Sequence, residues 1–272
     1  MRFAISTILL LLCLPRFLEA GVSQTAESAS FVVRSHAGGP SAQQILQECR
    51  SLRGDLHALL CGGEAITAWR PRCEVMVHAT RSSYLATVGR GGAQTLGSSL
   101  TEFSAGRILR RRVDLLADEH NNTPALAHEL THVVLAEQFG GSPPRWADEG
   151  LALLADSAHK QGLHMRDLAY ALRSGTTLRL GKLLSLDRPE SPQQMAAFYA
   201  QSLSLVKFLV ERDDHQQFLR FVQQAEVCDY DDALRNEYDI NGVADLERLW
   251  RDSIESREGA KFTPIGRIRY LE

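Results

Sequence analysis

The segment His128-Glu129-Leu130-Thr131-His132 constrains this chain more than any other feature of its 272 residues. If the segment is helical, its two histidines share one face of the helix, about one turn from each other. Two imidazoles in that arrangement can bind one metal ion, and Glu129 then stands at the rim of the same site. The segment therefore predicts a helix that carries a metal site and a carboxylate able to accept a proton.

Residues on either side of this segment indicate where the helix begins and ends. Thr123 is a suitable N-cap, and Pro124 suits the first helical position. Gly140-Gly141, followed by Pro143-Pro144, indicates the end of the helix. The residues between are apolar enough for a buried helix, in which unpartnered histidines and a glutamate would be costly. A metal ion supplies the missing partner. The alternative is an amphipathic helix whose histidines have ordinary hydrogen-bond partners and bind no metal.

A second helix is predicted after a proline-rich turn, over Arg145–Ser157. Its sequence Pro-Arg-Trp-Ala-Asp-Glu-Gly places Glu149 17 positions after His132 (149 − 132). That separation lets the chain turn and return antiparallel, with a carboxylate facing the metal. Catalytic zinc usually takes three protein ligands. Asp148 is the rival for the third ligand, because only one of two adjacent helical residues can face the metal.

The two segments together resemble the gluzincin metallopeptidases, and most of all the exported bacterial peptidase MA-like domains. Those domains carry Pro-x-Trp-x-x-Glu-Gly after a His-Glu-x-x-His helix, as this chain does. The resemblance is specific over roughly residues 106–211. It implies that His128, His132 and Glu149 bind one Zn²⁺ per chain, and that Glu129 is the catalytic general base.

The same resemblance implies an α+β, two-lobed zincin-like fold with the zinc site at the junction of the lobes. Residues 21–142 would form a mixed α/β lobe that ends in the zinc-binding helix, and residues 143–272 a helical lobe that supplies the third ligand. Residues 21–42 are rich in Ser, Ala and Gly, and part of them reads as a flexible lead. Apolar patterning predicts these further elements: strands at Ser30–Arg34, Arg72–Thr80 and Arg107–Leu116, a weak strand within Gly91–Thr101, and helices at Ser41–Leu60, Arg81–Val88, Leu163–Leu172, Gln193–Glu211, Gln216–Gln224 and Val243–Glu255.

Tyr199 and Ser202 resemble the Tyr-x-x-Ser helix of the same domains. Tyr199 is therefore the candidate for a hydroxyl that hydrogen-bonds the oxyanion of a tetrahedral intermediate. The alternative is that Tyr199 packs in a helical core with its hydroxyl at the surface. His164 and Tyr170 are reserve candidates. Two further histidines, His159 and His215, are expected to face solvent.

The strand predicted just before the zinc helix raises the question of how a substrate binds. In gluzincins a strand at this position forms the sheet edge along which an extended peptide lies. The resemblance therefore assigns that role to Ile108–Leu115, which would bind peptide by backbone pairing. Three consecutive arginines in it, Arg110, Arg111 and Arg112, could attract acidic substrates. Such a run more often forms a solvated edge that discourages aggregation, and we favour that interpretation.

The function implied by the resemblance is that of an exported zinc-dependent peptidase acting on a peptide or protein substrate. Aminopeptidases of this group carry a Gly-x-Met-x-Asn segment that captures the substrate's free amine, and this sequence has none. An endopeptidase or a specialised hydrolase is therefore expected. Two other classes stay open, namely a zinc hydrolase acting on a non-peptide amide in cell-wall material, and an inactive zincin-like binding protein. The intact Glu129 argues against the inactive protein.

Residues 1–20 predict a cleavable secretory signal peptide. They have a short basic start, a mostly apolar run from Ile5 to Leu14, and small residues at Ala20-Gly21. The apolar run is too short for a membrane span, which needs about 20 residues. Cys13 as a lipoprotein anchor is a weaker interpretation, because the residue before it is large. We therefore expect a secreted or periplasmic protein.

Charge and cysteine content agree with export. Removing residues 1–20 takes away two arginines and one glutamate, so the formal net charge changes from −3 to −4. Without a basic excess, nucleic acid is not an expected partner. Four cysteines remain, and this even number suggests two disulfides in an oxidising compartment. The alternative is that the cysteines are free thiols that pack as small buried hydrophobic residues. The connectivity stays open among Cys49, Cys61, Cys73 and Cys228, with a Cys49–Cys61 bridge or a bridge to Cys73 considered.

Overall fold

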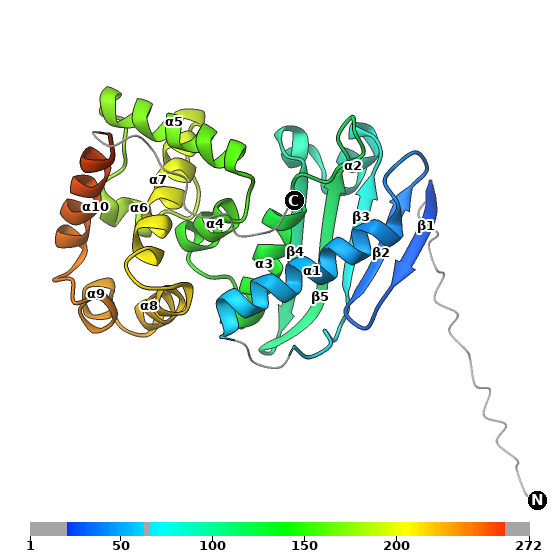
Figure 1. Ribbon diagram of the computed structural model, residues 1–272, viewed down its shortest axis with the longest axis horizontal. Helices are drawn as coiled ribbons and strands as arrows, with labels where there is room; N and C mark the ends of the chain where they lie inside the picture. The colour runs from blue at the N-terminus through cyan, green and yellow to red at the C-terminus, as the bar shows by residue number, and fades with distance from the viewer. Residues whose placement is uncertain (1–20, 63–65, 259–272) are drawn as a thin grey trace, which may run out of the picture.

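The computed structural model describes residues 21–62 and 66–258. The predicted signal peptide and the last 14 residues lie outside the described residues. Within these ranges the chain forms a mixed α+β structure, with a sheet on one side and a group of helices on the other (Figure 1). No helix among the described residues combines the length and the apolar character that a membrane crossing requires.

The sheet has the strand order β1-β2-β3-β5-β4. Strands β2, β3 and β5 are parallel to one another, whereas the edge strands β1 and β4 pair antiparallel with β2 and β5. β1 lies within residues 21–42, part of which was expected to be a flexible lead; pairing with β2 makes this part a strand. The strands are β1 (Val22–Glu27), β2 (Phe31–His36), β3 (Cys73–His78), β4 (Gly97–Ser104) and β5 (Arg107–Leu116).

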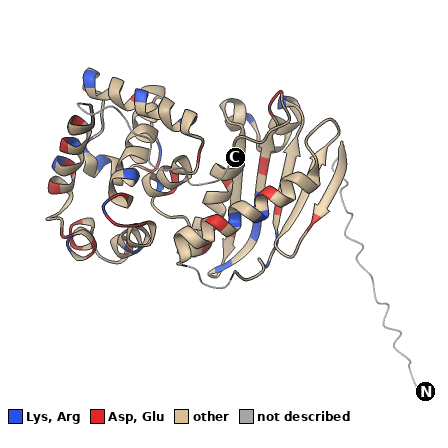
Figure 2. Cartoon of the chain, viewed as in Figure 1, with Lys and Arg blue, Asp and Glu red and all other residues tan. Residues whose placement is uncertain are grey.

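The strand order corrects the expected edge of the sheet. The bounds of β5 match the predicted strand, but β5 lies between β3 and β4, so Ile108–Leu115 is not an edge. The edge next to the helical half of the molecule is β4. The three consecutive arginines of β5 (Lys and Arg are blue in Figure 2) form neither a free basic patch nor a solvated edge, because each binds a carboxylate: Arg110 to Glu74 at 3.2 Å, the buried Arg111 to Glu137 at 2.9 Å, and Arg112 to Asp114 at 2.7 Å.

One face of the sheet is covered by α1 (Ala42–Cys61) and α3 (Leu126–Phe139). Val33, Val75 and Val113 are in register across three strands, so their side chains share a face, and all three are fully buried in the core with both helices. Between β3 and β4 the chain forms α2 (Arg81–Val88) and the short 3₁₀ helix η1 (Arg90–Gln94). The packing of α3 against the sheet places this helix beside β4 and β5.

The helix α3 begins slightly later than expected. Thr123 and Pro124 precede it in a turn, in which the Thr123 carbonyl accepts a hydrogen bond from Leu126 N at 3.0 Å, and Ala125 is the residue before the first helical turn. The predicted stop is confirmed, because Gly140 ends the helix in the left-handed conformation with φ 60°. The shift does not move the histidines off the helix.

Between residue 143 and residue 258 the chain is mainly helical. α7 lies at its centre and contacts α4, α5, α6, α8 and α10. Five of these helices were expected; α6 and α9 were not, and α5 is longer than predicted. The helices are α4 (Arg145–Leu154), α5 (Ala158–Ser174), α6 (Leu180–Leu184), α7 (Pro192–Val210), α8 (His215–Val227), α9 (Tyr230–Tyr238) and α10 (Val243–Glu258).

The four cysteines after residue 20 are free thiols. Cys49 and Cys61 lie on the same helix, twelve residues apart, which at the helical rise is about 18 Å. This distance is too long for a disulfide, so the Cys49–Cys61 pairing considered from the sequence is wrong. Cys49 and Cys73 are fully buried in the core between α1 and the sheet. These two residues behave as small buried hydrophobes.

Candidate metal centre

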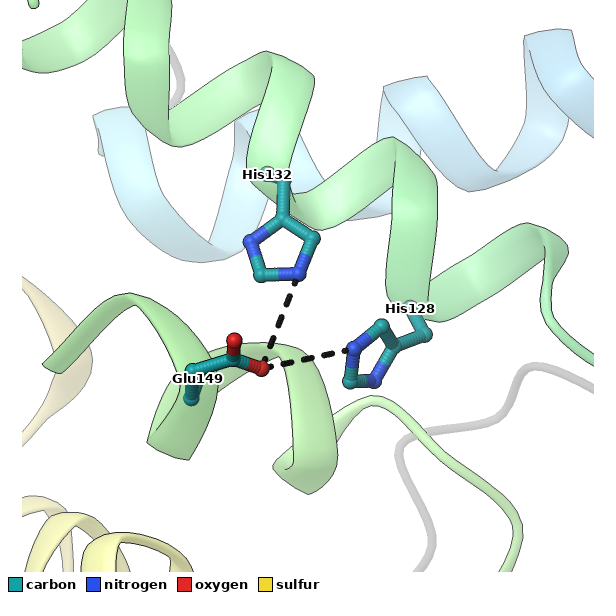
Figure 3. A group of neighbouring side chains, drawn as sticks. All are labelled: His128, His132 and Glu149. Carbon is teal, nitrogen blue, oxygen red and sulfur yellow. Dashed lines mark ion pairs between the residues drawn. The ribbon is translucent and has the colours of Figure 1, made fainter. Parts of the chain in front are cut away.

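Three side chains from two successive helices converge where α3 meets α4. His128 and His132 come from α3, and Glu149 points toward both from α4 (Figure 3). Glu149 Oε2 lies 3.7 Å from His128 Nε2 and 3.9 Å from His132 Nε2. One ligand atom from each residue lies within 4.8 Å of the others, the only such group of metal-ligating side chains in the described ranges.

Two residues of α4 explain why Glu149 reaches this position. The Trp146 side chain is buried, and its Nε1 donates a hydrogen bond to the Tyr230 hydroxyl at 2.9 Å, which anchors the first turn of α4. At Gly150 an added Cβ would lie 2.4 Å from Val206 Cγ2 and 2.7 Å from the Ser202 carbonyl oxygen of α7. The glycine therefore permits a close approach of α4 to α7. Together the two contacts fix the rotation of α4 that turns Glu149 toward α3.

The other ring nitrogen of each histidine is bound by a carboxylate. His132 Nδ1 lies 2.8 Å from Asp148 Oδ1, and His128 Nδ1 lies 3.2 Å from Asp156 Oδ2. Such contacts fix the ring orientation and leave both Nε2 atoms facing Glu149. Asp148, the rival for third ligand, is thus placed behind the ring of His132, while Glu149 stands in front of it.

Asp156 was not singled out from the sequence. It follows α4 directly, and its side chain is almost fully buried. Lys160 Nζ binds its second carboxylate oxygen at 3.0 Å and also donates to the Pro124 carbonyl at 2.8 Å. A lysine four residues after an aspartate near a helix start is a common pattern, so the sequence offered little signal. The contact connects the start of α5 to the turn that precedes α3.

The electrostatics follow from this clustering of charge. Burial lowers the pKa of His132, but Asp148 first and then Glu149 and Glu129 outweigh it and raise that pKa to about 9. Burial raises the pKa of Glu149 above its usual range, against the effect of the two histidines. Burial also acts to raise the pKa of Asp156, yet the contact with His128 brings it below its usual value. These shifts are the ones expected where carboxylates and imidazoles converge in a buried place.

Glu129 lies beside the cluster in the first turn of α3 and is buried. Its Oε2 accepts a hydrogen bond from Ser99 Oγ of β4 at 2.7 Å. The carboxylate therefore faces the edge strand and does not join the three-residue group. This position leaves it next to the first histidine but free of a ligand role.

Tyr199 of α7 lies on the same side as Glu149. Its hydroxyl donates to Glu149 Oε1 at 3.5 Å and accepts a hydrogen bond from Arg145 Nη2 at 3.3 Å. The hydroxyl thus faces the cluster and not the protein surface. Burial, followed by the charge of Glu149, raises the pKa of Tyr199, so it is a neutral donor at ordinary pH. Arg145 was not anticipated as a partner of the site.

The reserve candidates differ in their positions. The His164 ring centroid lies 6.4 Å from that of Tyr199, and the buried Nδ1 of His164 has no hydrogen-bond partner within the part of the chain that the structure describes. Tyr170 is 66% exposed. Of the two histidines expected to face solvent, His159 is exposed, whereas His215 is half-buried and burial lowers its pKa. The expectation for His215 is therefore wrong.

The donor set fits a catalytic metal ion. Two imidazole nitrogens and one carboxylate oxygen are the protein ligands of many catalytic zinc sites, and both imidazoles have the carboxylate contacts that such ligands usually make. A His-Glu-x-x-His helix with a glutamate from the next helix is the arrangement of the gluzincin class.

Comparison with protein families gives the same assignment. Residues 117–256, which is 140 of the 272 residues, match the family model of the Peptidase MA superfamily. The chain belongs to this superfamily. The match begins directly after β5 and ends within α10, so it includes the three converging side chains and Glu129. A search of curated proteins finds no match to this chain.

Proposed function

We propose that this protein is an exported zinc-dependent peptidase that holds one Zn²⁺ through His128, His132 and Glu149. The convergence of the two Nε2 atoms and one carboxylate oxygen within 4.8 Å carries the proposal. Membership of the Peptidase MA superfamily supports it. Export rests on the sequence of residues 1–20 alone. When bound, the ion would supply Lewis-acid activation of a water molecule and of the scissile carbonyl.

The residues of the chain then have distinct roles. Glu129 accepts the proton of the attacking water and returns it to the leaving nitrogen. Its place in the first turn of α3, beside His128 but outside the ligand group, suits that role. Tyr199 donates a hydrogen bond from its hydroxyl to the developing oxyanion. Arg145 binds the Tyr199 oxygen and so holds the hydroxyl on the Glu149 side of the site.

The strand β4 provides the place for an extended substrate. Among the residues that the structure describes, it pairs with β5 on one side only, and α3 packs beside it. An extended peptide can add to such an edge through backbone hydrogen bonds, independently of which side chains the strand carries. The peptide-binding role expected for Ile108–Leu115 therefore passes to β4 in this proposal.

Metal analysis and a peptide digest test the proposal. We expect purified protein to contain about one zinc per chain and to cleave a mixed peptide library. Cleavage should stop with a chelator and return with added zinc. Glu129→Gln should retain zinc and lose cleavage. Protein that contains no zinc after reconstitution, or a Glu129→Gln variant that cleaves as fast as the wild type, would show the assignment to be wrong.

A further inference from the structure

We propose that the edge strand β4 positions the general base, with Gly97 and Ser99 together forming a cradle for the Glu129 carboxylate. Ser99 is a positioning residue in this proposal, because it acts through Glu129. The inference rests on the proposed function, since it assigns the partner of the catalytic base. It extends that function by making one strand responsible both for binding the substrate and for orienting the base.

The hydrogen bond between Ser99 and Glu129 is the first observation. Ser99 Oγ donates to Glu129 Oε2 at 2.7 Å, a short contact typical of a hydroxyl bound to a carboxylate. The two residues are 30 positions apart and belong to different elements, so the contact is part of the tertiary structure and not of a local turn. A carboxylate with one oxygen held in this way has fewer orientations available to it.

The backbone of Gly97 is the second, independent observation. A Cβ added at Gly97 would lie 2.6 Å from Glu129 Cγ, 2.7 Å from Glu129 Oε1 and 2.7 Å from Ala125 Cβ. Atoms do not approach that closely, so only glycine leaves space for the Glu129 side chain against the strand. The position requires no unusual backbone angle, and space alone explains the glycine.

The alternation of a strand puts both residues on the same side of β4. Gly97 and Ser99 are two positions apart, so they face α3 together, while Ser98 between them faces the opposite side of the sheet. The Glu129 side chain packs against the backbone of Gly97, and Ser99 donates a hydrogen bond to Glu129 Oε2. A displacement of β4 would therefore move the base, which couples substrate pairing at this edge to the orientation of Glu129.

Three variants test the cradle, with zinc content measured for each. Ser99→Ala removes the hydroxyl and should lower kcat by about tenfold, the loss of one hydrogen bond to a charged group. The KM for a peptide selected from the library digest and the zinc content should stay at wild-type values. Ser99→Thr keeps a hydroxyl and should recover most of the rate. Ser98→Ala is the matched control for the position of Glu129, because strand alternation places its side chain on the side of β4 opposite to Ser99.

Crystal structures of the Ser99→Ala and Ser98→Ala variants give a readout that does not depend on activity. We expect the Glu129 carboxylate to leave its position in the first variant and to keep it in the second. A wild-type kcat for Ser99→Ala, or an unmoved Glu129 in its structure, overturns the cradle. If the wild-type protein cleaves no peptide, the proposed function fails, while the two structures still decide whether β4 holds Glu129.

Discussion

Asp148 Oδ1 lies 2.8 Å from His132 Nδ1, on the side of the ring opposite to the nitrogen that faces Glu149. Two adjacent residues of α4 thus act on the two nitrogens of one imidazole. The Asp148 carboxylate fixes the ring and raises its basicity, and the Glu149 carboxylate faces the ring nitrogen that would bind a metal ion. In the proposed zinc site, the direction in which each side chain leaves the helix favours Glu149 over Asp148 as the third ligand.

This arrangement predicts that Asp148→Asn weakens zinc binding without removing it. The amide can still contact Nδ1 but no longer supplies a negative charge, so we expect zinc affinity to fall about 10- to 100-fold. Competition with a chromogenic chelator measures the affinity. Asp55→Asn, at an exposed position of α1, is the control and should leave affinity unchanged. Equal affinities for the two variants would contradict a role for Asp148 at the site.

The metal-free centre should also respond to pH. Burial lowers the pKa of His132, but Asp148 and its neighbours outweigh it and raise that pKa to about 9. The metal-free protein thus carries His132 protonated at neutral pH, and zinc must displace that proton. We expect zinc affinity to increase with pH up to about 9. Calorimetry at pH 7.5 in two buffers of different ionisation enthalpy should detect the release of about one proton.

The same pKa sets the sign of a stability effect. The folded-state value lies above the ordinary 6.5, so protonated His132 stabilises the metal-free fold. That contribution is complete below about pH 6.5 and is lost as the pH rises through about 9. Urea unfolding of the metal-free protein at both pH values measures it. A metal-free protein that is equally stable at both values, and that releases no proton on binding zinc, would exclude this account of His132.

Local patterns predicted the parts of the site that are local. The four-residue spacing of His128 and His132 and the glycine at position 140 are properties of one helix, and the structure has them as expected. Glu149 was assigned from a family resemblance, and α4 presents it toward α3. Contacts between residues far apart in the chain could not be predicted from local sequence patterns. Ser99 is 30 positions from Glu129, and Asp156 is 28 from His128.

The errors in the fold have the same physical origin. The bounds of β5 follow from its own alternation, but its place inside the sheet depends on β4, whose sequence is polar and weakly patterned. β1 is similarly polar and exists as a strand because β2 pairs with it. The short helices α6 and α9 carry too few turns for a clear period, and packing against α7, α8 and α10 stabilises them. Strand order and short elements are decided by tertiary packing.

Gly150→Ala should destabilise the protein and disturb the third ligand. The new methyl group would lie 2.4 Å from Val206 Cγ2 and 2.7 Å from a backbone oxygen of Ser202, so α4 must move away from α7. We expect a loss of about 1–3 kcal/mol in the free energy of unfolding, together with weaker zinc binding. Gly162→Ala in α5 meets no atom within 4 Å and should instead raise stability, by about 0.5–1 kcal/mol. Urea titrations of both variants measure the difference, and a neutral Gly150→Ala would argue against close packing of α4 on α7.

Tyr199→Phe should separate chemistry from metal binding. The hydroxyl lies 3.5 Å from Glu149 Oε1 and is held by Arg145, so its removal leaves the three ligand atoms in place. If the hydroxyl stabilises the oxyanion, we expect kcat to fall about 100-fold with little change in KM or zinc content. Tyr170→Phe, at an exposed position of α5, should behave as the wild type. A Tyr199→Phe variant that loses zinc in proportion to activity would instead mean that Tyr199 supports the ligand Glu149 and takes no part in the reaction.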